Sequence, residues 1–415
     1  MKKLVSSRFL AVVLLLTPLK ALADSQYYRA LADNHEARPE RDWLTSFKAD
    51  LMGGMANSAR NGSKNSCNPL QIFGANKIGL LAEDASGNPS TNIQNADLAA
   101  LLLLAPSANI TYSGKFNFVE FHLNAQQNFV HGFFGELDLP VKNLNVHNVT
   151  WADTTTGPDD NTVQWETVKN SLSSILSSFS LTAGDYKKTG IGDIVLNLGW
   201  THNNDDISAL DFFDTTFRVG VSIPSAAKKN QDQAFSIPLG YDGHIGIPVA
   251  FDFGLGFYDW VTWGVHVDAI FFIKKTIDGL RMQTNTAQNG YIKLLKGTAK
   301  RELGHIFNAG SFLKLDHVFK GFSASVGYNY IHKDKDYLTP SDLTTFTVAT
   351  ANSDALLLGW NMHAIHAVIE YDFSREGKEC NPTVSLYYAR PVAGKRIFQT
   401  NTIGGDLGLN LAWNF

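Results

Sequence analysis

The sequence predicts an all-β fold, a transmembrane antiparallel β-barrel of about twelve strands with long external loops and one loop helix. Three observations lead to this prediction. The C-terminal residues alternate between apolar and polar, the N-terminal residues have the pattern of an export signal, and the strand candidates are joined by alternately long and short connections. The composition agrees, because only 18% of the residues are charged, against ~25% in ordinary soluble domains.

The N-terminal segment predicts export. We expect residues 1–23 to be a signal peptide and the mature chain to begin at Asp24. Removal of this segment takes four of the 35 basic residues and none of the 39 acidic ones, so the formal charge falls from −4 to −8. An acidic chain without a basic, aromatic-rich cluster does not fit a nucleic-acid partner. The positive start, the apolar run and the cleavage site are Lys2, Lys3 and Arg8, residues 10–16, and Ala21-Leu22-Ala23.

The C-terminal stretch is the clearest strand. Large apolar residues occupy every second position, which indicates a strand with one apolar and one polar face. Because it ends on an aromatic residue, this stretch resembles the terminal strand of bacterial outer-membrane β-barrel proteins. The resemblance implies a signal for the barrel-assembly machinery and a place in the outer membrane of a Gram-negative-type bacterium. The residues of this signal are Leu407, Leu409, Leu411, Trp413 and Phe415.

The same period of two continues through residues 44–415, which we predict to form the barrel domain. The strands have roughly 9–14 residues, the length that a tilted membrane strand needs. Residues 24–43 are polar without a clear period, which predicts a periplasmic tail or, alternatively, a short plug. The twelve predicted strands are 44–56, 108–121, 128–141, 192–202, 211–223, 247–258, 260–274, 301–316, 319–332, 363–373, 382–390 and 403–415.

The connections after odd-numbered strands are long and those after even-numbered strands are short. One short turn is predicted around Asn124-Ala125-Gln126, between the second and third strands. Transmembrane barrels have short periplasmic turns, long external loops and an even number of strands. The alternation therefore predicts that the long connections are external. These connections are 57–107, 142–188, 224–246, 277–300 and 335–360.

Two of the long connections carry apolar residues. The pieces 70–73 and 98–106 predict that the first connection folds back into the barrel mouth; an additional hairpin, giving fourteen strands, is the alternative. In the second connection, residues 162–180 predict an amphipathic helix near the pore entrance. The alternative is that the apolar face of this helix packs on other loops. The residues of this apolar stripe are Val168, Leu172, Ile175, Leu176 and Phe179.

Charged side chains should point into the barrel, because a charge on the lipid face costs ~2–4 kcal/mol at mid-bilayer. The inward set is mainly acidic, which predicts a polar lumen that favours cations or neutral small solutes. The alternative is that the charges pair and fill the interior, as in barrels of ~8 strands. The pore-lining candidates are Lys48, Asp50, Glu136, Asp138, Asp193, Arg218, Asp252, His266, Asp268, Lys314, Asp316, Glu370 and Asp372.

Enzymatic motifs are missing from the sequence. It has no phosphate-binding loop, zinc-protease helix or nucleophile elbow, so we predict neither an enzyme nor a cofactor or metal site. His363 and His366 should lie on opposite faces of a strand. The acidic runs 159–160 and 334–336 could bind calcium but are more simply solvated loops. Cys67 and Cys380 should lie on opposite sides of the membrane, too far apart for a disulfide.

Two short motifs carry a second resemblance. The run Thr189-Gly190-Ile191-Gly192-Asp193 and the strand end Arg218–Pro224 resemble strand segments of the long-chain fatty acid and aromatic-hydrocarbon outer-membrane transporter group. This resemblance implies uptake of hydrophobic compounds. The sequence departs from that group because Asp24–Trp43 contains no Asn-Pro-Ala hatch.

The sequence thus predicts an outer-membrane channel for small solutes with an acidic-leaning polar lumen. Its expected partners are outer-membrane lipid, the assembly machinery and a small-molecule solute. Two alternatives remain, a structural or surface-interaction barrel acting through its external loops and a hydrophobic-compound uptake channel. The identity of the solute, an open or plugged lumen, and a monomeric or trimeric state stay open at this point.

Overall fold

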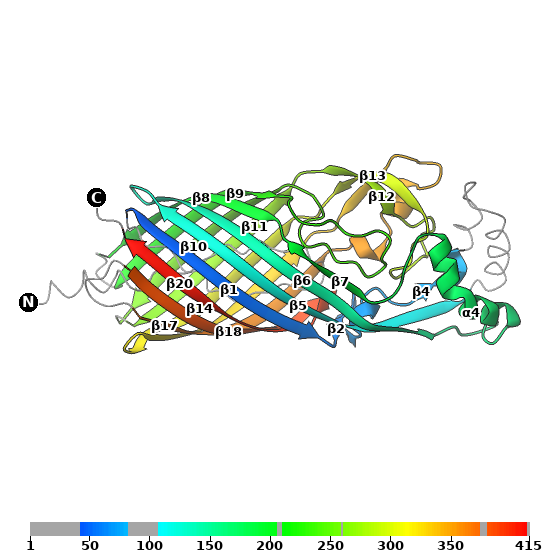
Figure 1. Ribbon diagram of the computed structural model, residues 1–415, viewed down its shortest axis with the longest axis horizontal. Coiled ribbons are helices and arrows are strands. Elements are labelled where there is room, and N and C mark those ends of the chain that lie inside the picture. Colours follow the sequence, from blue (N-terminus) through cyan, green and yellow to red (C-terminus); the bar gives the residue numbers. More distant parts are fainter. Residues whose placement is uncertain (1–41, 82–106, 206–209, 259, 374–379, 413–415) are drawn as a thin grey trace, which may run out of the picture.

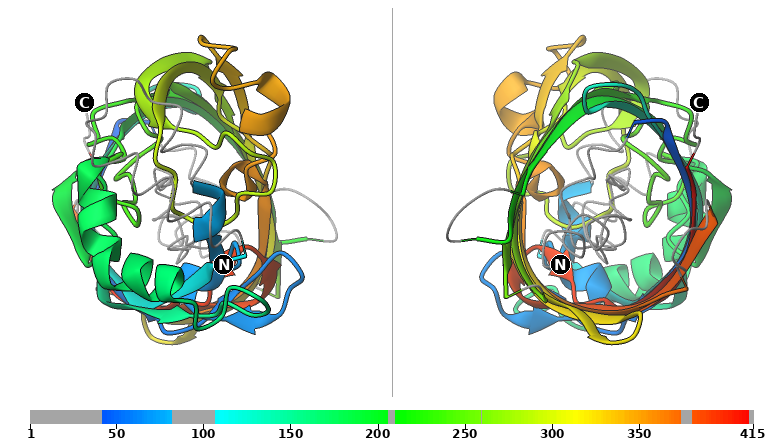
Figure 2. Two further views of the ribbon diagram at one scale, coloured as in Figure 1. Left: turned by 90° about the vertical axis from the view of Figure 1, so that its right-hand side faces the viewer. Right: turned by 90° about the vertical axis from the view of Figure 1, so that its left-hand side faces the viewer.

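The chain folds into one closed antiparallel β-barrel (Figure 1). The computed structural model describes residues 42–81, 107–205, 210–258, 260–373 and 380–412. The ring closes because β1 (Leu44–Ala56) pairs with both β20 (Asn401–Ala412) and β5 (Asn109–Asn128). Twelve strands form the ring, as predicted, and Figure 2 shows it along its axis.

The remaining wall strands pair in sequence order around the ring. A break at Gly192 and Asp193 divides one of them into β7 and β8, both of which pair with β6. The strands are β6 (Phe133–Asp153), β7 (Tyr186–Ile191), β8 (Ile194–Asn204), β9 (Phe212–Ile223), β10 (Gly246–Phe257), β11 (Val261–Phe272), β14 (Ile306–Phe319), β15 (Phe322–Lys333), β17 (Trp360–Asp372) and β18 (Cys380–Lys395).

The outer face of the wall is apolar. Leu51, Leu198 and Leu407 are 56%, 67% and 65% exposed, and residues between them in the alternation are buried and mostly polar. Large exposed apolar patches are rare on water-soluble monomers, so this surface belongs in a lipid bilayer. Of the predicted assembly signal, Leu407, Leu409 and Leu411 lie on this face. Trp413 and Phe415, like the predicted signal peptide and most of the predicted tail, lie outside the described residues.

The predicted turn around Asn124-Ala125-Gln126 is wrong. These residues lie within β5, where the amide side chains of Asn124 and Gln126 face the lumen. The chain turns instead at residues 129–132, where His131 and Gly132 have φ values of 59° and 78°. Two consecutive residues with positive φ give the turn type that matches the twist of a hairpin. Polar residues in this part of the sequence thus indicate the inner face of a wall strand and not a turn.

The external end of the barrel carries a folded layer, which we call the cap (Figure 1). It consists of the external ends of β5 and β6 and of the connections L1 (57–108), L2 (154–185), L3 (224–245), L4 (273–305), L5 (334–359) and L6 (396–400). Its smaller elements are β2 (Ala59–Arg60), β3 (Ser66–Cys67), η1 (Pro69–Gln71), β4 (Asn76–Lys77), η2 (Ile78–Leu81), α4 (Val163–Ser178), β12 (Lys275–Arg281), β13 (Lys296–Glu302), β16 (Tyr337–Pro340), α5 (Val348–Ala351), η3 (Ala355–Leu357) and β19 (Ile397–Phe398).

Helix α4 confirms the helix predicted in the second connection. The Thr162 hydroxyl caps its start by accepting a hydrogen bond from the Trp165 backbone N–H at 3.2 Å. The apolar stripe is buried in the same cluster as residues of L1, L3 and L4. The helix therefore packs on other loops, which was the alternative reading of its apolar face. No helix of the described residues is long and apolar enough to span a membrane.

Two predicted boundaries of the external connections need correction. The wall strand β6 continues to Asp153, so much of 142–188 is strand. The strand predicted from residue 301 begins at Ile306, because Arg301 and Glu302 pair with L5 in a separate three-stranded sheet. The described part of L1 adds no spanning hairpin. Its apolar residues Leu70 and Phe73 are buried in the cap core, as predicted, and 98–106 lies outside the described residues.

The two cysteines lie at opposite ends of the barrel and are unpaired. Cys67 belongs to the cap, where it pairs with Ala59. Cys380 is the first residue of β18 and lies opposite Leu411, at the end where β1 begins. The predicted separation of the two thiols is confirmed.

Candidate transport path through the barrel and its cap

The inner face of the wall is lined by polar side chains. All the charged candidates from the sequence face inward, and all but Glu370, whose side chain is 17% exposed, are buried. Arg218 and Asp252 are 0% exposed. Such burial of ionised groups requires partners of opposite charge or hydrogen bonds.

Arg218 supplies this compensation near the middle of the wall. Its Nε lies 3.5 Å from Glu136 Oε1, and its Nη1 contacts the Asp252 carboxylate. On the neighbouring strands, Asn308 Nδ2 donates to Asp268 Oδ2 at 2.6 Å and lies 3.2 Å from His266 Nε2. The amide side chain of Asn308 therefore bridges His266 and Asp268.

A second group of contacts lies around two lysines. Lys314 Nζ lies 3.2 Å from Asp316 Oδ1 and 3.6 Å from Glu370 Oε1. Lys48 Nζ lies 3.0 Å from Asp406 Oδ2. Lys314 thus pairs with acids on its own strand and on β17, two strands away, and Lys48 pairs with an acid on the adjacent strand β20. Nearby, the Tyr387 hydroxyl donates to Asp50 Oδ1 at 2.6 Å.

A third group, on β5 and β6, adds Glu120, His122 and Lys142 to the predicted lining residue Asp138. His122 Nδ1 lies 3.3 Å from Asp138 Oδ1, and its Nε2 lies 3.2 Å from Glu120 Oε2, which is also 3.6 Å from Lys142 Nζ. Because a turn was predicted around residues 124–126, the residues next to it were not assigned to the lumen. The signal was nevertheless present, because polar residues at 120, 122, 124 and 126 alternate with the apolar residues between them.

Acidic residues outnumber basic ones on the described inner wall. All five bases lie within ion-pair distance of acids, so pairing removes part of the negative charge. The bases are Lys48, Lys142, Arg218, Lys314 and Lys333, and the acids are Asp50, Glu120, Glu136, Asp138, Asp214, Asp252, Asp268, Asp316, Glu370, Asp372 and Asp406.

Asp193 differs from the other candidates because it holds a loop. It lies at the break between β7 and β8, and its two carboxylate oxygens accept hydrogen bonds from the backbone N–H groups of Ala226 (3.0 Å) and Tyr241 (2.6 Å). The Ser225 hydroxyl accepts a third bond from the Ile194 N–H at 3.0 Å. These contacts fasten L3 to the external rim of the wall, where β7 pairs with β6 on one side.

The cap has an apolar core of its own. A chain of edge-to-face aromatic contacts crosses it, from Tyr112 on β5 to Phe235 in L3, to Tyr291 in L4 and to Phe73 in L1, with ring centroids 5.0, 5.3 and 5.4 Å apart. Such pairs stabilise by roughly 0.5–1.5 kcal/mol each beyond burial. The core continues into buried residues of the wall such as Phe116. The cap is therefore anchored to the barrel mouth by apolar packing.

Buried ion pairs add to this packing. Arg301 donates to Asp242 of L3 at 2.9 Å and to Asp336 of L5 at 2.6 Å, and Asp336 also contacts Lys333 and accepts from the Gly304 N–H at 2.8 Å. Asp336 is 0% exposed, so its predicted place in a solvated loop is wrong. Burial raises the pKa of this carboxyl, but the two cations hold it below its usual value.

The other histidines and acids singled out in the sequence form no metal site. His363 is partly exposed and contacts the Tyr328 hydroxyl at 2.5 Å, whereas His366 is buried, so the two lie on opposite faces as predicted. Asp159 is buried and accepts hydrogen bonds from Ser107, so the solvated loop predicted for 159–160 is wrong at this residue. No cluster of three His, Cys, Asp or Glu side chains able to hold a metal occurs in the described part of the chain.

Comparisons with solved structures agree with the barrel. An outer membrane channel from Pseudomonas putida F1 aligns with a TM-score of 0.51 and 12% identity, over 92% of this chain and 99% of that one. The chain shares the fold of that outer membrane channel. The toluene transporter TodX of Pseudomonas putida (TM-score 0.29, 8% identity, 95% and 96% covered) and the translocator domain of the Neisseria meningitidis autotransporter NalP (0.35, 10%, 89% and 88%) match more loosely. No protein-family model and no curated protein matches the chain.

Proposed function

We propose that this chain is an outer-membrane channel that takes up small apolar compounds. The observation that carries the proposal is the apolar core of the cap, which spans the external mouth from L1 to L4 and continues into the wall. A polar solute that crossed this core would lose its hydrogen bonds to water, which costs several kcal/mol. An apolar solute gains about 25 cal/mol for each Å² of its surface removed from water.

The break in the wall at Gly192 and Asp193 offers this solute a second route. Beside β7 the wall is covered by L3, whose Leu239 lies 2.9 Å from the position that a Cβ on Gly190 would occupy. A covering loop can move without breaking the hydrogen bonds between wall strands. We therefore place here the step in which the solute leaves the barrel sideways through its wall. Residues 189–193, at this break, carry the motif whose resemblance implies uptake of hydrophobic compounds.

Uptake measurements test the proposal. The mature chain would be expressed in a bacterial strain without general porins, and the entry rates of radiolabelled toluene and of a neutral sugar of similar mass would be compared. We expect faster uptake of toluene alone. Equal stimulation of the sugar would contradict an apolar filter, and no stimulation of either by correctly folded protein would favour the surface-interaction reading.

A variant in the core sharpens this test. Phe235→Asp places a charge among Tyr112 and Tyr291 and should reduce toluene uptake. Leu343→Asp is the matched control, because Leu343 is 58% exposed on L5 and lies outside the core. Equal uptake by the two variants would argue against passage through the cap core.

A second candidate function is a water-filled channel for small cations or neutral polar solutes. It is favoured by the excess of acids on the inner wall, which would repel anions. Single-channel recording in asymmetric KCl separates the two functions. Stable steps with a cation-selective reversal potential would support the second candidate, and silence from folded protein would support an apolar pathway.

A further inference from the structure

The cap contains a cavity with a mixed apolar and charged lining, and the proposed transport does not use its charged groups. Its volume is ≈ 70 Å³ and it lies between L3, L4 and L5. A water molecule needs about 10–15 Å³ by this measure. The cavity therefore has room for several waters or for one small ligand with few non-hydrogen atoms.

Basic groups outnumber acidic ones in the walls of this cavity. Two carboxylates, Asp242 and Asp354, face four bases, and each carboxylate already has a partner. Arg301 donates to Asp242 at 2.9 Å, and Lys293 Nζ lies 3.5 Å from Asp354 Oδ1. Arg281 lies 3.4 Å from Asp232, outside the cavity, so three of the four bases have an acidic partner. The four bases are Lys229, Arg281, Lys293 and Arg301.

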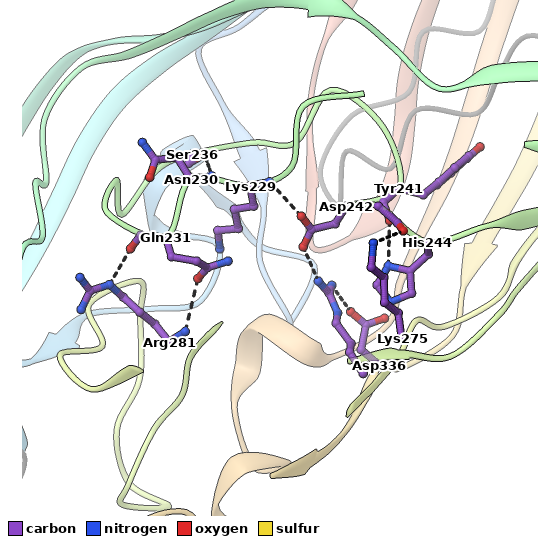
Figure 3. Close-up of polar contacts among 12 residues, drawn as sticks. Lys229, Asn230, Gln231, Ser236, Tyr241, Asp242, His244, Lys275, Arg281 and Asp336 are labelled. Carbon is purple, nitrogen blue, oxygen red and sulfur yellow. Dashed lines mark hydrogen bonds and ion pairs between the residues drawn. The ribbon is translucent and has the colours of Figure 1, made fainter. Parts of the chain in front are cut away.

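Lys229 is the base without a counter-charge. Within the described residues its ammonium group forms no ion pair or hydrogen bond; only its backbone N–H is bonded, to Asp242 Oδ1 at 2.8 Å. Figure 3 shows the side chain running away from Asp242 toward Gln231. Burial lowers the pKa of Lys229, and the attraction of Asp242 and Asp354 only partly offsets this effect. An anion in the cavity would supply the missing partner.

Tyr291 also lines this cavity and carries a second group without a partner. Its side chain is 8% exposed, and no group in the part of the chain that the structure describes bonds its buried hydroxyl. The residue is held in place by Asn76 of β4, whose Oδ1 accepts from the Tyr291 backbone N–H at 2.7 Å. Buried hydroxyls normally have a partner, so an unpaired one beside a cavity indicates a place for a ligand atom.

We propose that this cavity binds a small oxyanion, a phosphate or a short carboxylate, with the Lys229 ammonium as its counter-charge and the Tyr291 hydroxyl as a hydrogen-bond donor. Both ligands present oxygen atoms that accept charge-assisted hydrogen bonds. A bound anion would join L3 to L4 and so stabilise the cap. The proposal does not depend on the transported solute.

Calorimetric titration of the refolded mature chain in detergent tests the site. Inorganic phosphate and acetate would be titrated separately, which distinguishes a phosphate ligand from a carboxylate. We expect saturable binding of at least one anion. Lys229→Met should weaken it tenfold or more, and Lys300→Met should leave it within twofold, because Lys300 is an exposed lysine of β13.

Tyr291→Phe is the second variant, in case loss of Lys229 disturbs the cap. It removes one oxygen that has no partner within the described residues, so we expect normal folding and anion affinity reduced severalfold. Absence of saturable heat for both anions in the wild type would overturn the proposal. So would equal affinities of the Lys229→Met and Lys300→Met proteins. Neither result would bear on toluene uptake.

Discussion

Arg281 Nη2 donates a hydrogen bond to the Phe179 carbonyl oxygen at 2.8 Å and thereby fastens L4 to the C-terminal end of helix α4. The same guanidinium donates to the carbonyl of Ser180 at 3.0 Å and to that of Lys293 at 3.2 Å. Its Nε donates to the Gln231 carbonyl at 2.5 Å. One side chain therefore joins L2, L3 and L4, and Figure 3 shows it beside Gln231.

Replacement of Arg281 by Met should loosen the cap and leave the barrel folded. The carbonyl groups that it bonds would lose charge-assisted donors, each worth about 1.5–3 kcal/mol. Hydrogen–deuterium exchange should show faster exchange in α4, L3 and L4. Lys300→Met is the matched control. If exchange rose equally in the wall strands, the cap and the barrel would be a single cooperative unit.

Asp336→Asn should destabilise the cap by about 3–5 kcal/mol, because removal of one partner of a buried ion pair leaves the other uncompensated. Arg301 would keep Asp242, whereas Lys333 would lose its carboxylate. The control is Asp334→Asn, since the Asp334 side chain is 46% exposed. Limited proteolysis of L5 at increasing urea concentration measures the difference. Equal protection of the two variants would contradict the importance of this buried cluster.

The period of two identified the wall strands because a bilayer imposes it. Each wall strand must place apolar residues such as Leu198 in lipid and polar ones such as Asn197 inside, and a sequence shows this alternation without knowledge of pairing. The turn at His131 and Gly132 was missed because amide side chains at 124 and 126 are equally common in turns and on a polar inner wall.

The contacts within the cap could not be predicted from the sequence, for a different reason. Its contacts join residues that are far apart in sequence, such as Asn76 with Tyr291 or Arg301 with Asp336. No local period predicts such pairs. The apolar stripe of α4 did predict a packed helix, but it could not identify the partner surface. Asp336 lies among charged neighbours in the sequence, so its burial could not be read from composition.

Arg218→Met should destabilise the barrel itself. Glu136 and Asp252 would remain buried without the guanidinium that contacts both, and we expect a loss of about 3–5 kcal/mol. Equilibrium unfolding in urea measures it, with Arg218→Lys as the variant that retains the charge. Unchanged stability of Arg218→Met would mean that water reaches these carboxylates.

Asp153→Asn should release helix α4 from the tip of β6. The Asp153 carboxylate accepts from Trp165 Nε1 at 2.8 Å and from Lys169 Nζ at 2.9 Å. Burial raises its pKa, but hydrogen bonds from Thr155, Lys169 and Trp165 outweigh this effect and lower it to about 2. The contribution to stability is therefore present above pH 3.8 and is lost as the pH falls through about 2.

Tryptophan fluorescence during acid titration checks this prediction. In Asp153→Asn, loss of the charged carboxylate that binds Lys169 and Trp165 should weaken the docking of α4 by roughly 1 kcal/mol. The fluorescence change of the variant between pH 4 and 2 should therefore be smaller than that of the wild type. The exposed neighbour Asp160 provides the control Asp160→Asn. A transition of unchanged size in Asp153→Asn would show that another carboxyl causes it.

His244 should make the external cap sensitive to mild acid. Its ring is 0% exposed, Nδ1 donates to the Tyr241 carbonyl at 2.9 Å, and Nε2 has no partner within the described residues. Burial, helped by the nearby Arg301, lowers the pKa of His244 below 6.5. The unfolded chain therefore binds a proton first, so this contribution to stability is present above pH 6.5 and declines below it.

Exchange rates of L3 amides, measured between pH 7 and 5 and corrected for intrinsic chemistry, should reveal this decline. His244→Asn keeps a donor for the Tyr241 carbonyl and removes the titrating ring, so the dependence on pH should flatten. His332→Asn should retain it, because His332 is 39% exposed and contacts Asp334 at 3.1 Å. A pH dependence that survives in His244→Asn would assign the acid sensitivity to another group of the cap.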